Sequence, residues 1–365
     1  MNAGQRARLR QGPHGQVACW RAGCYCAVEI GYDQSSVKGV HKSLSFFQPA
    51  KQAAAQGGAE RNSEAPDVQD MASGLQHQEA TFPAGDGLCL YEQSWQPEKS
   101  AASVAIVHGY AEHSARYAHV AAHLAQHGYA VYAFDLRGHG RSAGRRCFVR
   151  SFDEYLADLE LFLARVAARA PGKPIFMLGH SMGGAIATLF VIKRRAVLRG
   201  LILSGASLKI SDDVSPALRR VSAFVGRLFP KLPTIRLDSR AISRDPEVVK
   251  SYETDMLVYH GSAPAGTATS FFRAVSDIQA GMELIDLPLL ILHGAQDRLA
   301  DVAGSKRLYA RVRSRDKQLK LYDGLYHEIL NEPERAQVLA DITTWLAARA
   351  QPASMTEDDV SWQRR

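Results

Sequence analysis

The sequence predicts an α/β fold in which helices cover both faces of a mostly parallel β-sheet. Short apolar runs alternate with amphipathic stretches over residues 102–204, and the same alternation resumes over residues 289–349. Alternation of this kind is typical of parallel sheets, because each parallel connection needs a crossover that is usually a helix. Polar or glycine-rich motifs follow several of the apolar runs, at the sheet edge where such folds bind ligands.

Local patterns predict the individual elements. Two strand-like runs at residues 80–83 and 88–91 flank Gly85-Asp86-Gly87, which indicates a β-hairpin with a glycine turn. Further strands are predicted at residues 102–107, 130–134, 175–178, 201–204, 289–292 and 319–322. Helices are predicted at residues 115–127, 152–169, 185–190, 301–314 and 332–349.

One long segment interrupts the alternation. Residues 207–283 hold amphipathic pieces and prolines without a clear strand, and they are too long for a connecting loop. We therefore expect an inserted helical cap there, within a folded domain at residues 76–350. Residues 1–75 are rich in Gln, Ala, Gly and Ser and predict a disordered extension, with Met71 as an alternative start. Residues 351–365 are predicted to form a tail.

Charge and apolar content exclude several classes of protein. The net charge of +7 comes from scattered arginines, without the interleaved aromatics of a nucleic-acid site. Attraction of this positively charged protein to anionic lipid surfaces is an alternative that the sequence leaves open. No apolar run approaches the ~20 residues of a membrane span, and the N-terminus lacks the apolar core of a secretory signal. We expect a soluble cytoplasmic protein, with peripheral membrane contact through the cap as an open alternative.

Neither the cysteines nor the histidines predict a metal site. The five cysteines are irregularly spaced, which argues against a disulfide framework and indicates free thiols. Cys24 and Cys26 are too close together for a usual zinc pair. His119, His123 and His127 recur every fourth residue, but no carboxylate or cysteine accompanies them, so we interpret them as an exposed or half-buried helix face. We expect no metal and no organic cofactor.

The stretch PIFMLGHSMGG (174–184) contains the candidate nucleophile. Residues 179–183 fit G-x-S-x-G, the turn between a strand and a helix that exposes a serine above a sheet. An apolar run precedes the motif and helix-prone residues follow it, as the motif requires. Glycines are expected where two backbones approach closely. Ser181 is therefore the candidate nucleophile, and an unreactive serine in a glycine-rich loop is the alternative.

Chain order selects the partners of Ser181. A serine hydroxyl needs a base to take its proton and an acid to orient that base, and in this motif the order is Ser, Asp or Glu, His. His327 is the histidine that remains beyond the strand at residues 289–292 and the carboxylates that follow it. Asp297 is the preferred acid, whereas Asp301 is the expected cap of the next helix and Asp323 is a weaker rival. A surface loop is the alternative for His327.

Two backbone N–H groups are expected to complete the site. The N–H of Met182 lies at the start of a helix, where it can donate to a developing oxyanion. The second N–H should come from the loop after the strand at residues 102–107, and we select Tyr110. The side chain of His108 is expected to brace this loop rather than to react.

Five motifs resemble the monoacylglycerol lipase and lysophospholipase branch of the α/β-hydrolases. They are HGYAEHSARY (108–117), DLRGHGRSAG (135–144), GHSMGG (179–184), HGAQDRLAD (293–301) and YHEILNE (326–332). The resemblance covers about residues 77–349. It implies an α/β-hydrolase fold, a triad of Ser181, Asp297 and His327, oxyanion donors at Tyr110 and Met182, and a cap that lines an acyl-chain tunnel.

The resemblance also bears on the alcohol end of the substrate. Glu112 and Arg116 match a glutamate and an arginine that lie near this end in the family, which implies substrate contact. A salt bridge that only braces the loop is the alternative. Ala111 stands where many relatives have glycine, and Leu330 stands where some have a second histidine near the glycerol head group. These departures concern head-group preference and leave the chemistry untouched.

The residues and the resemblance together predict a serine hydrolase that splits monoacylglycerols or similar single-chain lipid esters into fatty acid and glycerol through an acyl-enzyme on Ser181. Lysophospholipids or short esters are alternative substrates, and a cofactor-free haloperoxidase activity is a further alternative. A lipid-binding protein without activity is the alternative of another class, although binding alone would not need all three triad residues. Dehalogenases and epoxide hydrolases of this fold are disfavoured, because they have Asp where this chain has Ser181.

Overall fold

The computed structural model describes residues 75–194, 198–210 and 224–350. The predicted tail and, apart from its last residue, the predicted N-terminal extension with its alternative start at Met71 lie outside these ranges. Within the described ranges, no helix is both long enough and apolar enough to cross a membrane.

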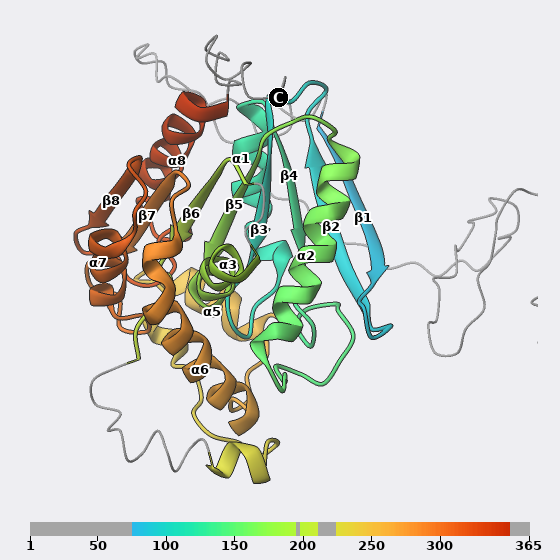
Figure 1. The fold of residues 1–365 in the computed structure, drawn as a ribbon, viewed down its shortest axis with the longest axis vertical. Coiled ribbons are helices and arrows are strands. Elements are labelled where there is room, and N and C mark those ends of the chain that lie inside the picture. Colours follow the sequence, from blue (N-terminus) through green and yellow to red (C-terminus); the bar gives the residue numbers. More distant parts are fainter. Residues whose placement is uncertain (1–74, 195–197, 211–223, 351–365) are drawn as a thin grey trace, which may run out of the picture. The chain divides into compact units, whose positions relative to one another are not determined.

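An eight-stranded sheet lies at the centre of the described domain (Figure 1). Its strands are ordered β1-β2-β4-β3-β5-β6-β7-β8. β1 pairs with β2, and β2 with β4, in antiparallel fashion, whereas all other neighbours are parallel. The bounds are β1 Gln76–Pro83, β2 Cys89–Gln96, β3 Ala102–Val107, β4 Tyr129–Phe134, β5 Ile175–His180, β6 Gly200–Ser204, β7 Leu289–Gly294 and β8 Lys317–Tyr322.

Helices cover both faces of this sheet (Figure 1). α1 (Ala118–Gln126) and α8 (Arg335–Ala350) contribute to the buried apolar cluster on one face. α2 (Phe152–Arg169), α3 (Ser181–Arg194), α6 (Ala265–Gly281) and α7 (Val302–Arg311) contribute to the cluster on the other. The predicted α/β fold with a mostly parallel sheet and helices on both faces is therefore confirmed.

Local signals set several helix boundaries. α2 begins at Phe152, as its helical spacing predicts, because Ser151 and Glu154 form a capping box. α7 begins after Asp301, whose Oδ1 accepts a 2.8 Å hydrogen bond from the N–H of Ala303. The expectation that Asp301 is a helix cap is thus confirmed. The helix predicted at residues 115–127 is divided between a short 3₁₀ turn, η2 (Ser114–Tyr117), and α1.

The histidines along α1 contact protein groups. The Nε2 of His119 lies 2.8 Å from the carbonyl oxygen of Leu330, and the Nε2 of His123 lies 3.0 Å from the Oγ1 of Thr343 in α8. His127, at the end of the helix, places Nδ1 2.8 Å from the carbonyl oxygen of His123. The contact between His123 and Thr343 therefore joins α1 to α8.

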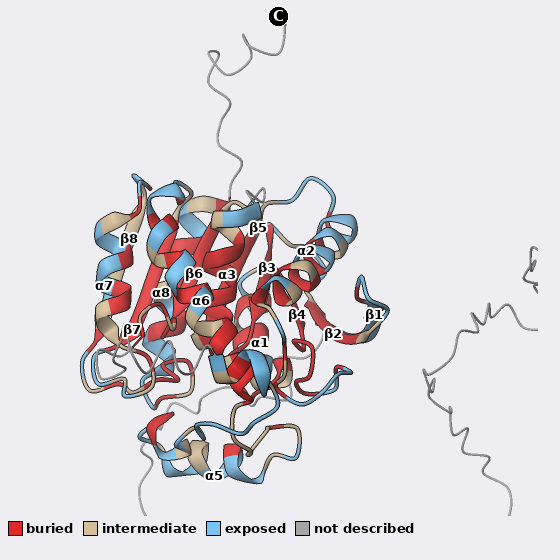
Figure 2. Ribbon diagram, turned by 60° about the horizontal axis from the view of Figure 1, so that its bottom comes forward, coloured by how far each residue is buried: buried red, intermediate tan, exposed pale blue. Residues whose placement is uncertain are grey.

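The segment between β6 and β7 adds no strand to the sheet in its described part. It contains η3 (Ser239–Ala241), α5 (Pro246–Thr254), α6 and η4 (Met282–Leu284). α5 and the loops beside it are largely exposed, and they lie where the parallel strands end (Figure 1, Figure 2). α6 differs, because it packs on α3 and adds Ala274 and Ile278 to the buried cluster over the sheet. The cap boundaries at residues 207 and 283 stay predictions.

Candidate active site

Ser181 lies at the turn between β5 and α3. Its φ is +52°, in the left-handed region that residues with a Cβ rarely adopt. A Cβ at Gly179 would lie 2.8 Å from the carbonyl oxygen of Gly183, and a Cβ at Gly183 would lie 2.2 Å from that of Val107. Only glycine fits at these two places, so the glycines of the motif permit the sharp turn on which Ser181 lies. Backbone strain of this kind persists where the surrounding structure enforces it, often at functional sites.

Two hydrogen bonds link Ser181, His327 and Asp297. The Oγ of Ser181 lies 2.8 Å from the Nε2 of His327, and the Nδ1 of His327 lies 2.7 Å from the Oδ2 of Asp297. The other carboxylate oxygen, Oδ1, accepts hydrogen bonds from the N–H groups of Leu299 and Ala300 at 2.8 and 2.9 Å. Asp297 follows β7 and His327 follows β8, so the sheet brings the three predicted residues together with geometry suited to proton transfer.

The histidines near Ser181 have pKa values shifted in opposite net directions, although burial acts to lower all three. Burial lowers the pKa of His108 to about 4 and that of His180 to about 3. Burial also acts to lower the pKa of His327, but the charge and hydrogen bond of Asp297 outweigh it and raise the pKa above 6.5. Burial acts to raise the pKa of Asp297, yet the charge of His327 and the hydrogen bond from His293 hold it well below its usual range. His327 is thus the strongest base of these three histidines.

The loop after β3 lies directly against the serine turn. A Cβ added at Gly109 would be only 3.2 Å from the Cβ of Ser181. Two residues further on, Ala111 has a φ of +68°, in the left-handed region that favours glycine. The backbone N–H groups of Tyr110 and Met182 belong to these two adjoining turns. Their role as oxyanion donors stays a prediction.

Two side chains brace this loop. The Nε2 of His108 accepts a 2.9 Å hydrogen bond from the N–H of Leu136, and its Nδ1 lies 2.8 Å from the carbonyl oxygen of Gly109. This is the bracing role that we expected of His108. The Oε1 of Glu112 accepts hydrogen bonds from the N–H of Gly109 at 2.5 Å and from the hydroxyl of Tyr117 at 2.7 Å. The loop is therefore fixed at its base by polar groups in the interior.

Arg116 connects this loop to the residue that follows His327. Its guanidinium donates to Glu112 at 2.9 Å and to both carboxylate oxygens of Glu328 at 2.7 and 2.8 Å. Burial acts to raise the pKa of Glu328, but the charge of Arg116 outweighs burial and keeps the carboxylate ionised. The salt bridge considered for Glu112 and Arg116 is present. Their contact with substrate stays a prediction.

Comparisons with known proteins identify the family. Residues 98–334 match the family model described as Serine aminopeptidase, S33. The monoacylglycerol lipase of Mycolicibacterium smegmatis is 41% identical over 271 residues, which covers 74% of this chain and 97% of that protein. This chain belongs to the monoacylglycerol lipase branch of the α/β-hydrolases. It is an ester hydrolase.

Two further relatives agree with this placement. The human monoglyceride lipase is 32% identical to this hydrolase over 272 residues, which covers 73% of this chain and 90% of that protein. The crystal structure of the Paleococcus ferrophilus monoacylglycerol lipase is 28% identical, with a TM-score of 0.64, and covers 75% of this chain and 99% of that chain. The resemblance drawn from the five motifs is therefore confirmed.

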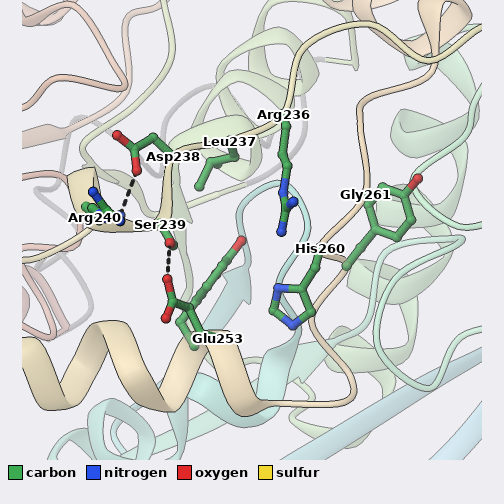
Figure 3. Close-up of a pocket in the computed structure, with 10 residues that line it drawn as sticks. Arg236, Leu237, Asp238, Ser239, Arg240, Glu253, His260 and Gly261 are labelled. Carbon is green, nitrogen blue, oxygen red and sulfur yellow. Dashed lines mark hydrogen bonds between the residues drawn. The ribbon is translucent and has the colours of Figure 1, made fainter.

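A polar cavity of about 450 Å³ opens in the described part of the cap of this hydrolase (Figure 3). It is lined by residues 236–240, by Tyr252 and Glu253 at the end of α5, and by residues 259–261. The lining does not include the triad. Apolar side chains elsewhere in the cap are exposed, namely Phe224, Leu228, Phe229, Leu232 and Ile235.

Sequence reasoning missed three polar residues at the site of this hydrolase. The Nε2 of His293 lies 3.1 Å from the Oδ2 of Asp297, and the Oγ of Ser207 lies 3.4 Å from that of Ser181. Glu328 is the third. His293 and Glu328 stand inside motifs that the sequence analysis already used, beside residues it selected. Ser207 follows β6 in a stretch without a motif, so no signal marks it.

Proposed function

We propose that this hydrolase cleaves monoacylglycerols into fatty acid and glycerol through an acyl-enzyme on Ser181. The observation that carries the proposal is the hydrogen-bond chain from Ser181 through His327 to Asp297, with distances of 2.8 and 2.7 Å. The names of the relatives from Mycolicibacterium smegmatis and Paleococcus ferrophilus support this substrate class.

In the first half of the reaction, the Oγ of Ser181 attacks the ester carbonyl while the Nε2 of His327 takes the hydroxyl proton. Asp297 accepts the hydrogen bond from Nδ1–H of His327, which leaves Nε2 free to act as the base. Negative charge then develops on the former carbonyl oxygen. The N–H groups of Tyr110 and Met182 are the proposed donors to it, and each such donor contributes about 2.7–4 kcal/mol to catalysis.

Acylation is complete when His327 gives its proton to the glycerol oxygen and the ester C–O bond of the first tetrahedral intermediate breaks. The acyl group then stays on Ser181. A water molecule then attacks this acyl group while His327 takes one of its protons. The second tetrahedral intermediate breaks down, the proton returns to Ser181 and the fatty acid leaves. Water is the only co-substrate, so atoms and charge balance over the cycle.

The cap supports a peripheral contact with lipid. Phe224, Phe229 and Ile235 have exposed fractions of 64%, 63% and 78%. The exposed cations Arg227 and Lys231 lie among them in the chain. Apolar side chains beside cations favour binding to an anionic membrane surface. A cytoplasmic location with this membrane contact stays part of the proposal.

The test is a substrate panel for the full-length protein and its Ser181→Ala variant. The panel holds a long-chain monoacylglycerol, a lysophospholipid and p-nitrophenyl acetate. We expect monoacylglycerol to be the preferred lipid, and the variant to lose turnover of every ester. Faster turnover of the lysophospholipid would assign a phospholipase instead. Turnover of the acetate alone would overturn the lipid assignment, and no turnover by the folded protein would favour a lipid-binding role.

A further inference from the structure

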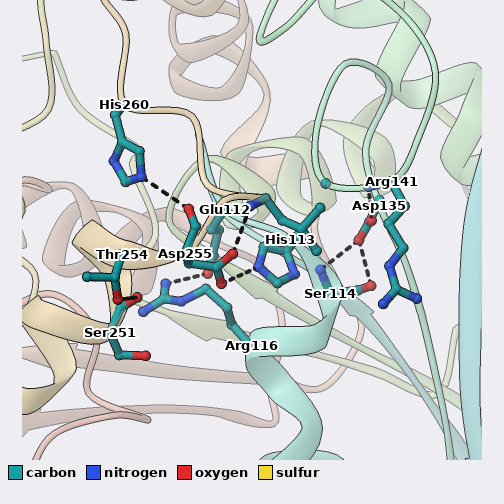
Figure 4. Close-up of polar contacts among 12 residues, drawn as sticks. Glu112, His113, Ser114, Arg116, Asp135, Arg141, Ser251, Thr254, Asp255 and His260 are labelled. Carbon is teal, nitrogen blue, oxygen red and sulfur yellow. Dashed lines mark hydrogen bonds and ion pairs between the residues drawn. The ribbon is translucent and has the colours of Figure 1, made fainter. Parts of the chain in front are cut away.

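The cap and the loop after β3 are joined by contacts that the proposed mechanism does not use (Figure 4). The backbone N–H of Tyr259 donates a 2.8 Å hydrogen bond to the carbonyl oxygen of Ala111. The Nε2 of His113 lies 2.8 Å from the Oδ2 of Asp255. The guanidinium of Arg116 lies over the ring of Tyr252 at 4.9 Å. One cap segment, residues 252–259, thus contacts three places in one short loop.

The pair formed by His113 and Asp255 is well fixed. The side chain of His113 is 5% exposed, and that of Asp255 is 27% exposed. The Oδ1 of Asp255 accepts a 2.8 Å hydrogen bond from the N–H of Leu257. Burial acts to raise the pKa of Asp255, but the hydrogen bonds from His113 and Leu257 outweigh it and lower the pKa. An ionised acceptor strengthens the bond to His113.

The loop needs such support because its backbone is strained. Ala111 has a φ of +68°, and a residue with a Cβ in such a conformation costs about 1–3 kcal/mol, so the conformation persists only where its surroundings enforce it. On the side of the sheet, Asp135 accepts hydrogen bonds from the N–H and the hydroxyl of Ser114 at 2.8 and 2.6 Å. On the side of the cap, the support comes from Tyr259 and from Asp255. Tyr110 immediately precedes Ala111 in the chain, so a shift of the strained residue would carry the N–H of Tyr110 with it.

We propose that Asp255 and His113 are positioning residues that hold the N–H of Tyr110 where it can bind the oxyanion. The inference rests on the proposed function, because it assigns the oxyanion to Tyr110. Neither side chain touches the reacting atoms, and both act through the backbone of Ala111. An oxyanion exists only in the transition states and intermediates, so a displaced donor lowers kcat and leaves KM nearly unchanged.

The first experiment compares Asp255→Ala with Glu253→Ala in the full-length protein. Glu253 is the matched control, because its carboxylate accepts its hydrogen bond from Ser239 within the cap. Asp255→Ala should lower kcat by about 10–100-fold on both a long-chain monoacylglycerol and p-nitrophenyl acetate, because small displacements at a reacting centre have effects of this size. KM should change by less than about threefold, and Glu253→Ala should retain activity within about twofold.

Variants of the partner test the pairing itself. His113→Ala should resemble Asp255→Ala, and the double variant should lose little more than either single variant, since all remove the same contact. His113→Gln keeps an N–H near the place of Nε2, so it should recover most of the activity. If the two single losses simply multiply in the double variant, the two residues do not act as a pair and the proposal fails.

A trifluoromethyl ketone reports on the oxyanion site directly, because it adds to the serine and forms a stable tetrahedral oxyanion. Its inhibition constant should rise in Asp255→Ala by the same factor by which kcat/KM falls. An unchanged constant, or a loss confined to the long-chain substrate, would overturn the proposal and leave Asp255 with a role in lipid access. If His113→Ala does not fold, Asp255→Ala still tests the proposal, because Asp255 is partly exposed.

The two proposals fail in different ways. If the wild-type protein hydrolyses the acetate ester but no monoacylglycerol, the substrate assignment is wrong. Acetate hydrolysis and inhibition by the ketone then still test the positioning role of Asp255. A folded wild-type protein that hydrolyses no ester and does not bind the ketone would overturn both.

Discussion

The sheet edge around Ser181 and the cap above it differ in what they bury. At the edge, polar groups are buried and bonded to one another: the side chain of Asp297 is fully buried and that of His327 is 4% exposed. In the cap, apolar side chains face solvent, with Phe229 63% and Ile235 78% exposed. Buried polar groups need partners, and the side chains of the triad find them in one another. Exposed apolar side chains give the cap a surface that can bind lipid.

This difference separates reaction rate from substrate choice. Substitutions at the sheet edge should slow every ester alike, because they change the reacting groups. Substitutions in the exposed part of the cap should affect only long-chain substrates. Asp255 is the proposed exception, since it lies in the cap and supports a loop of the sheet edge.

The largest effect is expected at the nucleophile. Ser181→Ala should lower kcat by about 10⁶-fold on lipid and acetate esters, because it removes the atom that forms the acyl-enzyme. Ser276→Ala is the control, since this exposed serine of α6 bonds only to the carbonyl oxygen of Phe272 among the described groups. Rates measured with both substrates check the prediction. Residual activity within a hundredfold of wild type would point to another nucleophile.

The next effect is expected at the acid. Asp297→Asn should lower kcat by about 10⁴-fold, because an amide no longer favours the tautomer of His327 with a proton on Nδ1. Asp301→Asn is the matched control, because asparagine caps a helix as well as aspartate does. It should keep activity within about threefold and change the free energy of unfolding by less than about 1 kcal/mol. Steady-state kinetics and urea unfolding measure the two quantities.

The same variant changes the pH dependence of kcat/KM. His327 acts as a base only when neutral, and its pKa is raised above 6.5, so wild-type activity should rise with a midpoint above pH 6.5. Asp297→Asn removes the charge that raises this pKa and leaves the burial that lowers it. The midpoint of the residual activity should therefore move to lower pH. A midpoint that stays in place would contradict the role of Asp297.

A smaller effect is expected at the close backbone contact. Gly183→Ala places a Cβ 2.2 Å from the carbonyl oxygen of Val107, so the turn must move. We expect a loss of about 1–3 kcal/mol in the free energy of unfolding and of about 10²-fold in kcat. Gly85→Ala is the control, because nothing lies within 4 Å of its added Cβ. Equal behaviour of the two variants would show that the contact is unimportant.

The smallest effect is expected in the cap. Phe229→Ser and Ile235→Ser should slow hydrolysis of monoacylglycerol in anionic vesicles by about tenfold, since each removes apolar area that lipid would cover. Hydrolysis of p-nitrophenyl acetate should not change. Vesicle sedimentation measures the binding in parallel. Loss of acetate activity would mean that these side chains support the fold of the site instead.

Much of the fold could be predicted from the sequence. The helix at residues 152–169 was predicted with its observed ends, because its apolar spacing and its capping residues agree. Ser181, Asp297 and His327 were selected by chain order, because each follows a strand and parallel strands end at one edge. Such rules are local or topological, so one sequence is enough to apply them.

Contacts between distant segments could not be predicted in this way. His113 and Asp255 are 142 positions apart, and Arg116 and Glu328 are 212 positions apart. These pairs form only because the cap and the last loop return to the same edge of the sheet. The cap also lacks the alternation of strands and helices, so its boundaries could only be placed where that alternation stops and where it resumes.

Chemical trapping with a long-chain p-nitrophenyl phosphonate tests the central claim most directly. The reagent leaves a stable adduct on a serine that attacks it, and its alkyl chain reports on lipid binding. We predict one adduct per chain, located on Ser181 by peptide mass spectrometry, and slower labelling when monoacylglycerol is present. Labelling of another residue, or labelling that monoacylglycerol does not slow, would contradict this account of the site.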